Sequence, residues 1–255
     1  MIEKGSATMV DFCLVTGAGG GIGSAVVSRL AADGFKILAA DLSLEKAAQS
    51  LVGISGQGHA AVALDVSDEA AVEALFAQYQ IDHVVAAAGI LLFAANGERP
   101  LITEMELKDW ELTQRVNSTG TFLLTRAYLR GATQRKIENG RFVGFASVAA
   151  QLGGYRSSSA YIASKSAVLG FIKAAARESA HLGITVNCVA PGLIDAPMLH
   201  QSLAPKDYHT VTGSIPLQRV GTTADIAGAV AFLMGPDASY ITGAVIDVNG
   251  GYRMQ

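Results

Sequence analysis

Short apolar runs alternate with helix-forming segments along almost the whole chain of 255 residues. The runs have the length of strands and are continuously apolar, as strands covered on both faces are. A helix between two strands supplies the crossover that parallel neighbours require. We therefore expect an α/β fold, a doubly wound, parallel, seven-stranded sheet. The expected strands are residues 12–16, 35–40, 60–64, 81–87, 141–146, 184–189 and 244–248, and the expected helices are residues 22–32, 67–79, 108–134, 160–180 and 224–234.

One domain is the simplest organisation for this pattern, because no linker, internal repeat or shift of composition divides residues 1–255. Half of the residues are apolar, which is enough for a large core. Two segments lack clear periodicity, residues 91–105 and residues 195–216. Loops of that length in a compact α/β protein often cover a binding site, so we expect these two to be the substrate loops.

The charge of the chain gives no reason to expect nucleic acid or an anionic membrane as a partner. Charged residues make up 16% of the chain, the formal net charge is -3, and no block of Lys or Arg occurs. We expect a small-molecule substrate and another copy of the chain as partners. The first twelve residues hold no apolar targeting core and no later run resembles a membrane span, which predicts a soluble, cytoplasmic protein. Cys13 and Cys188 lie in apolar runs and the histidines form no cluster, so we expect inert thiols and no metal site.

Five glycines occur among the first ten residues of the stretch LVTGAGGGIGSAVV, which begins at Leu14. The stretch follows the first expected strand and opens the first expected helix, which is where open α/β sheets bind phosphates. Free N–H groups and the helix dipole favour an anion there, and a side chain would block its approach. The stretch therefore predicts a phosphate-binding turn, and a glycine-rich turn that binds nothing is the alternative.

The spacing of these glycines distinguishes between kinds of phosphate loop. A Walker A loop would have lysine after its last glycine, whereas Ser24 follows Gly23. The pattern G-x-G-x-x-G also fits poorly, because Val26 stands in the place of the third glycine. The chain instead has Thr16-Gly17, three residues, and then Gly21-Ile22-Gly23.

Two acidic residues follow the second and third expected strands. Asp41 stands where a carboxylate would bind the ribose hydroxyls of adenosine. A carboxylate there repels a 2′-phosphate, and no Arg or Lys in the glycine stretch or directly after Asp41 offsets it. The cofactor is therefore expected to be NAD rather than NADP. Asp65 is either an adenine contact or the N-cap of the next helix.

Tyr161 and Lys165 are four residues apart in an expected helix and so lie on one face of it. A neighbouring ammonium favours the phenolate, which would lower the pKa of the tyrosine and suit it to proton transfer. Ser147 closes an expected strand at the sheet edge where ligands bind, and would hold a substrate oxygen beside the phenol. Asn117 is a polar residue in an otherwise apolar run. The alternatives are an exposed helix face for the Tyr-Lys pair and a local helix bond for Asn117.

These residues and Pro191-Gly192 occur in one order, and with them the sequence resembles the short-chain dehydrogenase/reductase family over nearly its whole length. The resemblance implies a Rossmann fold that binds NAD and transfers a hydride between it and a secondary alcohol or ketone. It implies that Tyr161 is the general acid/base, that Ser147 orients the substrate oxygen and that Lys165 binds the nicotinamide ribose. Asn117 would hold a proton-relay water. The implied cofactor-binding residues are Gly17, Gly21, Ile22, Gly23, Asp41, Asp65, Val66, Gly89, Tyr161, Lys165, Pro191, Gly192 and Ile194.

The chain departs from the family pattern at two places. Residues 86–89 read Ala-Ala-Ala-Gly where the family has an asparagine, so an amide that would bond the strand backbone is missing. Ala196 stands where the family often has threonine, which removes an expected hydrogen bond to the nicotinamide carboxamide. Neither departure changes a proton-transfer residue.

An active NAD-dependent alcohol dehydrogenase or carbonyl reductase is the expected function, and a non-catalytic dinucleotide-binding sensor or scaffold is the alternative. The presence of all four implied catalytic residues favours an enzyme, which the fold alone would not do. An epimerase or dehydratase with the same tyrosine and lysine usually has a longer chain and another glycine spacing. The resemblance also implies a homotetramer.

The substrate pocket is expected to take its walls from residues 91–95, 148–156 and 193–203. These segments are mostly small or apolar, which indicates an apolar pocket. Arg156 either pairs with an anionic group of the substrate or stays solvated at the mouth. The polar exceptions in the expected walls are Gln151, Tyr155, Arg156 and His200.

Overall fold

A computed structural model describes residues 12–94, 97–154 and 156–254. These residues form a seven-stranded parallel sheet with the order β3-β2-β1-β4-β5-β6-β9, which confirms the predicted fold class. A separate pair of two-residue strands, β7 and β8, lies outside this sheet. The strands are β1 (Phe12–Thr16), β2 (Ile37–Asp41), β3 (Ala60–Ala63), β4 (Ile81–Ala86), β5 (Arg141–Phe145), β6 (Thr185–Pro191), β7 (Ile194–Asp195), β8 (Gly221–Thr222) and β9 (Val245–Val248).

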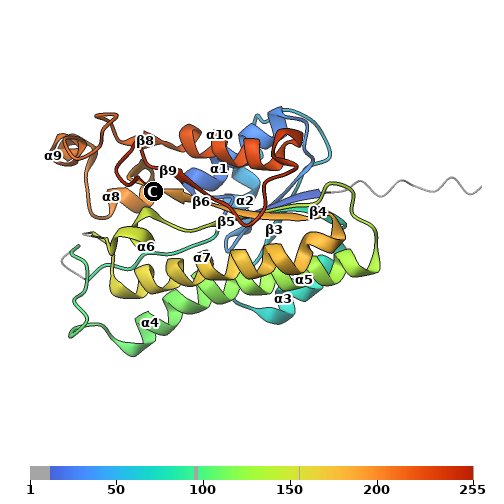
Figure 1. The fold of residues 1–255 in the computed structure, drawn as a ribbon, viewed down its shortest axis with the longest axis horizontal. Helices are drawn as coiled ribbons and strands as arrows, with labels where there is room; N and C mark the ends of the chain where they lie inside the picture. The colour runs from blue at the N-terminus through green and yellow to red at the C-terminus, as the bar shows by residue number, and fades with distance from the viewer. Residues whose placement is uncertain (1–11, 95–96, 155, 255) are drawn as a thin grey trace, which may run out of the picture.

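Helices cover both faces of the sheet (Figure 1). α1 and α10 pack against each other on one face, whereas α5 and α7 cover the other, with α3 packed beside α5. Across the described ranges, none of the helices has the length and hydropathy needed to span a membrane. The longer helices are α1 (Gly21–Ala32), α3 (Glu69–Gln78), α4 (Leu107–Gln114), α5 (Gly120–Gln134), α7 (Ser159–Ser179) and α10 (Thr223–Met234).

Each face of the sheet has its own hydrophobic core, because successive strand residues point to opposite helix layers. Leu14 and Val84 belong to the core under α5 and α7, whereas their neighbours Val15 and Val85 belong to the core under α1 and α10. All four side chains are fully buried. This explains why the strands are apolar at every position instead of at every second one.

The direction of winding changes beside β1. The chain runs from β1 through β2 to β3 on one side and then crosses to β4 on the other side of β1. In open α/β sheets, ligands bind at the carboxyl ends of the strands next to such a reversal. The glycine stretch after β1 and the segments that follow β4, β5 and β6 therefore share one edge of the sheet.

The structure differs from the sequence prediction mainly in short elements. The expected helix of residues 108–134 is interrupted by a π-helical turn, η1 (Arg115–Thr119), between α4 and α5. The second strand begins two residues later than expected, at Ile37. Segments without periodicity contain short helices that the sequence pattern did not reveal, because fewer than two turns give no repeat. These are α2 (Leu44–Gln49), α6 (Val148–Leu152), α8 (Pro197–His200) and α9 (His209–Thr212), with 3-10 turns at Ala180–Leu182, Pro205–Asp207 and Pro236–Ala238.

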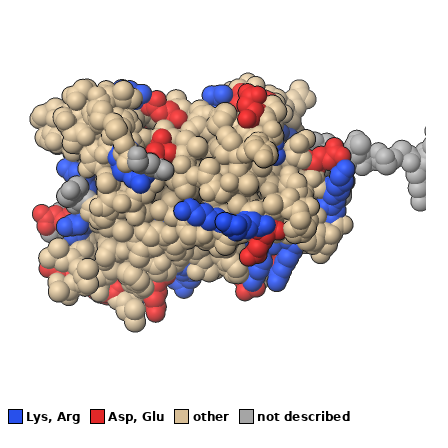
Figure 2. All heavy atoms as spheres, in the orientation of Figure 1, with Lys and Arg blue, Asp and Glu red and all other residues tan. Residues whose placement is uncertain are grey.

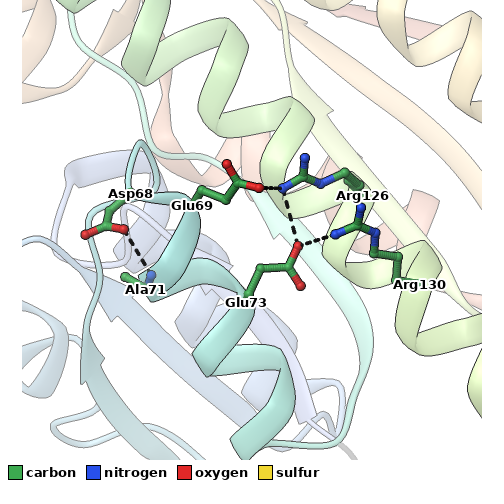
Figure 3. Close-up of polar contacts among 6 residues, drawn as sticks. All are labelled: Asp68, Glu69, Ala71, Glu73, Arg126 and Arg130. Atoms are coloured by element: carbon green, nitrogen blue, oxygen red, sulfur yellow. Dashed lines mark hydrogen bonds and ion pairs between the residues drawn. The ribbon is translucent and has the colours of Figure 1, made fainter.

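Charged side chains stand apart on a largely uncharged surface in the view of Figure 2. One group of them joins α3 to α5, as Figure 3 shows. Arg126 Nη2 lies 2.6 Å from Glu69 Oε1 and 3.3 Å from Glu73 Oε1, and Arg130 Nη1 lies 2.8 Å from the same Glu73 oxygen. Two arginines on α5 thus share two carboxylates of α3, which ties the shorter helix to the layer that carries the site.

Candidate active site

A cavity of about 330 Å³ opens at the carboxyl edge of the sheet, where the sequence placed the site. It is bordered by the segments that follow β4, β5 and β6, by α7 and by the loop of residues 195–216. Three of the four implied catalytic residues line it, namely Ser147, Tyr161 and Lys165. Besides Tyr161 and Lys165, five more of the implied cofactor-binding residues line it: Ile22, Gly89, Pro191, Gly192 and Ile194.

Tyr161 lies in the first turn of α7, and its place there is fixed by the helix cap. The Ser158 hydroxyl accepts a hydrogen bond from the backbone N–H of Tyr161 at 3.3 Å, as an N-cap residue does. Ser147 caps α6 in the same way, since its hydroxyl accepts from the N–H of Ala149 at 3.2 Å. Tyr161 and Ser147 are both buried and line the same cavity.

Lys165 lies one turn further along α7 and is almost completely buried. Its Nζ donates a hydrogen bond to the carbonyl oxygen of Phe145 at 2.9 Å and lies 5.9 Å from the centroid of the Tyr161 ring. Burial lowers the pKa of Lys165 to about 8. The ammonium is thus held against the backbone of β5, over the face of the phenol ring.

The pKa of Tyr161 shifts in the direction opposite to the one expected from the sequence. Burial raises the pKa of the phenol, and the hydrogen bond with Ser147 opposes that rise only in part. The expectation that Lys165 would lower it was wrong. The physical reason is that the ammonium bonds Phe145 instead of the phenol oxygen, so desolvation dominates.

Asn117 is fully buried in the π-helical turn η1. Its Oδ1 accepts from the N–H of Ile90 at 2.8 Å, and its Nδ2 donates to the carbonyl of Ile90 at 2.9 Å and to Ser164 Oγ at 3.0 Å. The alternative of a local helix bond for this side chain is therefore wrong. Ser164 in turn donates to the carbonyl of Tyr161 at 2.8 Å, so Asn117 supports both the segment after β4 and the start of α7.

The glycine stretch has the geometry that a pyrophosphate requires. Gly17 has a φ of +67°, and a Cβ at Gly23 would overlap the carbonyl oxygen of Gly17, so neither position accepts a side chain. The N-cap of α1 is Gly20, which provides no side-chain cap. Within the described chain, no residue accepts a hydrogen bond from the N–H groups of Gly21, Ile22 or Gly23. These three donors at a helix N-terminus fit a bound pyrophosphate.

Asp41 ends β2 beside this stretch, as the spacing predicted. Its Oδ2 accepts from the N–H of Gly19 at 3.0 Å and its Oδ1 from the N–H of Ser43 at 3.2 Å. A basic residue that sequence reasoning missed has its backbone and Cβ nearby, because α2 passes so close that a Cβ at Gly19 would overlap Cβ of Lys46. Lys46 belongs to a helix too short to give a periodic signal, so the sequence did not show that it returns to the glycine stretch.

Asp65 and Val66 follow β3 at the same edge. Asp65 is exposed, and its Oδ1 accepts from the N–H and the hydroxyl of Ser67 at 2.9 and 2.7 Å. The N-cap of α3 is Asp68, so the alternative of Asp65 as that cap is wrong. Val66 is buried and packs against Gly120 of α5, where a Cβ would lie 2.8 Å from Val66 Cγ2.

The backbone is well packed at both places where the chain departs from the family pattern. The Thr16 hydroxyl accepts from the N–H of Ala88 at 3.3 Å and so bonds the segment where an asparagine amide is missing. At the end of β6, Gly192 donates its N–H to the carbonyl of Val248 at 2.9 Å. Ala196 is buried beside the cavity and precedes α8.

The walls of the cavity away from the Ser147 and Tyr161 hydroxyls are mainly apolar, as expected. Both predicted substrate loops contribute, the first through Leu91 and the second through α8 and α9. Tyr252 near the C-terminus also lines the cavity, although no sequence signal indicated it. The apolar wall residues include Leu91, Val148, Leu152, Leu193, Met198, Leu199 and Val211.

Four polar residues were expected in the cavity wall. Gln151 and His200 do not line the cavity, and Tyr155 lies outside the residues that the structure describes. Gln151 turns away and donates to Asp247 Oδ1 at 2.9 Å. His200 Nε2 lies 2.7 Å from Asp195 Oδ1, which also accepts from the Tyr208 hydroxyl at 2.8 Å. This group fastens the second substrate loop instead of lining the cavity. Arg156 does line the cavity.

Known proteins resemble this chain over nearly its whole length. The family model described as Enoyl-(Acyl carrier protein) reductase matches residues 17–253. A (3R)-3-hydroxyacyl-CoA dehydrogenase from Canis lupus familiaris is 36% identical over 253 residues, which are 94% of this chain and 95% of the relative. A 3-oxoacyl-(acyl-carrier-protein) reductase from Vibrio cholerae is 36% identical over 242 residues, 94% of this chain and 96% of its own.

Solved structures extend the likeness to the fold. A 3-oxoacyl-(acyl-carrier protein) reductase with bound NAD from Brucella melitensis superposes with a TM-score of 0.85 at 31% identity. The superposition covers 96% of this chain and 92% of that one. The residues that the family model matches include Gly17, Gly21 and Gly23 of the glycine stretch and the segment that carries Ser147, Tyr161 and Lys165. The chain therefore belongs to the short-chain dehydrogenase/reductase family of oxidoreductases.

Proposed function

We propose that the protein is an NAD-dependent dehydrogenase or reductase that interconverts a secondary alcohol and a ketone. The observation that carries the proposal is the placing of two hydroxyl groups, those of Tyr161 and Ser147, at the buried end of an apolar cavity with Lys165 beneath them. In the reducing direction, a ketone, NADH and a proton give a secondary alcohol and NAD. The family relatives are oxidoreductases by name, which supports turnover over a non-catalytic sensor or scaffold.

The residues of the site divide the proton chemistry between them. NAD, when bound, supplies or accepts the hydride. Ser147 binds the substrate oxygen and Tyr161 transfers a proton to or from that oxygen. Because burial raises the pKa of Tyr161, the phenol is protonated at neutral pH and is ready to donate in ketone reduction. Lys165 lies close to Gly89, where a Cβ would be 3.3 Å from Nζ, and is placed to bind a ribose hydroxyl.

The substrate end of the cavity favours compounds with an apolar body. Its walls are mainly leucine, valine, methionine and alanine side chains, which limit the access of water to the reacting carbonyl. The relatives act on acyl groups, according to their names, and acyl chains would suit such walls. A panel of secondary alcohols, polyols, hydroxy acids, steroids and 3-oxoacyl thioesters, followed through NADH absorbance, tests the proposal. Turnover of at least one class supports it, and cofactor binding without turnover of any class would favour the sensor.

We propose NAD as the cofactor because the Asp41 carboxylate stands at the end of β2, held by two backbone N–H groups. A 2′-phosphate at that place would meet a negative charge. Lys46 is the opposing feature, since α2 brings its backbone next to the glycine stretch. The balance between the carboxylate and this ammonium sets the preference, and the NAD-bound relative from Brucella melitensis supports the carboxylate.

The variant Asp41→Asn is expected to raise the ratio of kcat/KM with NADPH to kcat/KM with NADH about tenfold to a hundredfold. The amide keeps an acceptor for the N–H of Gly19 and removes the negative charge. Glu45→Gln is the matched control, because it removes an equal charge from an exposed position in the first turn of α2. Initial rates and fluorescence titrations with both dinucleotides measure the effect. Equal use of both dinucleotides by the wild type, or equal shifts in the two variants, would contradict the proposal.

We further propose that the protein is a homotetramer in the cytoplasm. Large apolar side chains are exposed on the helix layer over the sheet, with Phe122 of α5 at 40% and Trp110 of α4 at 37%. Phe122 also packs edge-on against Phe171 of α7, with ring centroids 6.0 Å apart, so two helices share an apolar outer surface. Such a surface suits contact with another copy of the chain. Light scattering at micromolar concentration tests the assembly, and a monomeric mass would refute it; cell fractionation tests the location.

A further inference from the structure

Among the residues that the structure describes, two charged side chains line the active-site cavity, and one of these two belongs to the proposed proton-transfer group. Lys165 donates a hydrogen bond to the carbonyl of Phe145 and lies on the cofactor side of the site. The other is Arg156, which lies in the segment between α6 and α7. A positive charge that faces an apolar cavity without an anion costs free energy, so the position of Arg156 needs an explanation.

Arg156 uses few of its N–H donors within the described part of the protein. It is half-buried, and its Nη1 donates to the carbonyl oxygen of Ser202 at 3.1 Å. In the part of the chain that the structure describes, no carboxylate lies within ion-pair distance of it. A guanidinium carries five N–H groups in a planar fork that matches a carboxylate. One bond to a backbone carbonyl therefore leaves most of this fork available.

The surroundings of Arg156 on the solvent side do not supply an internal anion for it. A second hollow at the mouth of the site shares Arg156 and Ser202 with the cavity. Its other charged residues are Arg99, Glu98 and Glu104, which are all exposed. Arg99 donates to the carbonyl of Gly154 at 3.4 Å, and Glu104 accepts from a backbone N–H at 3.4 Å. Arg99, Glu98 and Glu104 together carry a net charge of -1, and water screens these exposed side chains, whereas Arg156 reaches the enclosed space.

We propose that the substrate carries a carboxylate and that Arg156 binds it, so that the protein acts on oxo acids and hydroxy acids. The inference rests on the proposed function, since it names the substrate class of the same site. The reacting oxygen lies at the Tyr161 and Ser147 end, the carboxylate lies at Arg156, and the apolar walls hold the carbons between them. Leu91, Val148 and Leu199 are among those walls.

The kinetic test compares methyl-ketone acids of five, six and seven carbons with their methyl esters. In the wild type, kcat/KM for the best acid should exceed that for its ester about tenfold to a hundredfold, which is the range for a hydrogen-bonded charge pair. Arg156→Gln should raise KM for the acid by a similar factor with kcat nearly unchanged, because the lost contact binds substrate and transition state alike. The ester should be unaffected. Arg156→Lys, which keeps the charge without the fork, should fall between the two.

The matched control is Arg99→Gln, which removes an exposed arginine from the mouth without touching the enclosed cavity. It should leave the ratio of acid to ester unchanged. A wild-type ratio near one would overturn the proposal. The same holds if Arg156→Gln weakens acid and ester equally, or if Arg99→Gln matches its effect on the acid.

A binding measurement separates this inference from the proposed function. Calorimetric titration with hexanoate and with hexanamide compares a carboxylate with a neutral compound of the same shape, and needs no turnover. Tighter binding of hexanoate in the wild type, lost in Arg156→Gln, supports the carboxylate site even if no ketone is reduced. Equal binding of the two compounds overturns it, while reduction of neutral ketones would leave the proposed function intact.

Discussion

Replacing Tyr161 by phenylalanine is expected to lower kcat about a hundredfold to ten-thousandfold, the usual contribution of a positioned acid or base. The change removes only the phenol oxygen, which lies at the buried end of the cavity beside Ser147. The ring remains to pack against α7 and its neighbours, so thermal unfolding should be nearly unchanged. NADH binding, followed by fluorescence titration, should also persist. Initial rates with the best substrate of the panel measure the loss.

A second tyrosine in the same cavity provides the control. Tyr252 lines the cavity from the C-terminal segment and is half-buried. Tyr252→Phe removes a hydroxyl of the same chemistry from a different wall, and kcat should change by no more than about a few fold. If Tyr161→Phe kept most of the turnover, or if both variants lost it equally, Tyr161 would not be the proton donor.

The raised pKa of Tyr161 gives this reaction a direction-dependent response to pH. Ketone reduction uses the protonated phenol, which is the form that burial favours, so its rate should not rise between pH 7 and 9. Alcohol oxidation requires the phenol oxygen to accept a proton, and the fraction able to do so grows as pH rises. We therefore expect the oxidation rate in wild type, but not in Tyr161→Phe, to increase over that range.

The sequence predicted the features that depend on repetition or on fixed spacing. Strand residues such as Val15 and Val85 are apolar because two helix layers cover the sheet, and a continuous apolar run is visible without a structure. The positions of Asp41 and of the Tyr161 and Lys165 pair follow from chain distance along one strand or one helix. For the same reason the edge of the sheet that holds the cavity was predictable.

Features that depend on distant contacts were not predictable in this way. Lys46 approaches the glycine stretch through a six-residue helix, and Tyr252 reaches the cavity from the far end of the chain. His200 was expected in the pocket wall, but a carboxylate and a phenol outside the cavity bind it. The direction of the Tyr161 pKa depends on burial and on where the Lys165 ammonium points, and neither is encoded in a spacing of four residues.

The contacts of Asn117 also could not be predicted from the sequence, and its replacement is the second prediction with a large expected effect. The sequence marked it as a polar residue in an apolar run, but its partners, Ile90 and Ser164, are 27 and 47 residues away. Through them it positions the segment after β4, which leads into the cavity wall, and the carbonyl of Tyr161. Its side-chain amide donates both of its N–H groups to these partners. Under the proposed function, we therefore expect Asn117 to be a positioning residue whose loss disturbs Tyr161 without touching the substrate.

Asn117→Leu is expected to lower the free energy of unfolding by about 2–5 kcal/mol, because it leaves the buried N–H and carbonyl of Ile90 without partners. It should also lower kcat per folded molecule at least about tenfold, since small displacements of a catalytic group are costly. Asn187→Leu is the matched control. Asn187 is equally buried and clamps the backbone of residues 241 and 244, outside the cavity lining.

Thermal unfolding and active-site titration with NADH separate the two effects of these variants. Both should unfold at lower temperature, but only Asn117→Leu should lose turnover per molecule that still binds NADH. If Asn117→Leu does not fold, the milder variant Ser164→Ala replaces it. This variant keeps the hydrogen bonds between Asn117 and Ile90 and removes the hydrogen bond to the carbonyl of Tyr161. We expect it to lower kcat modestly with little change in KM. Equal loss of turnover per folded molecule in Asn117→Leu and Asn187→Leu would mean that the π-helical asparagine supports the fold in general and not the position of the phenol.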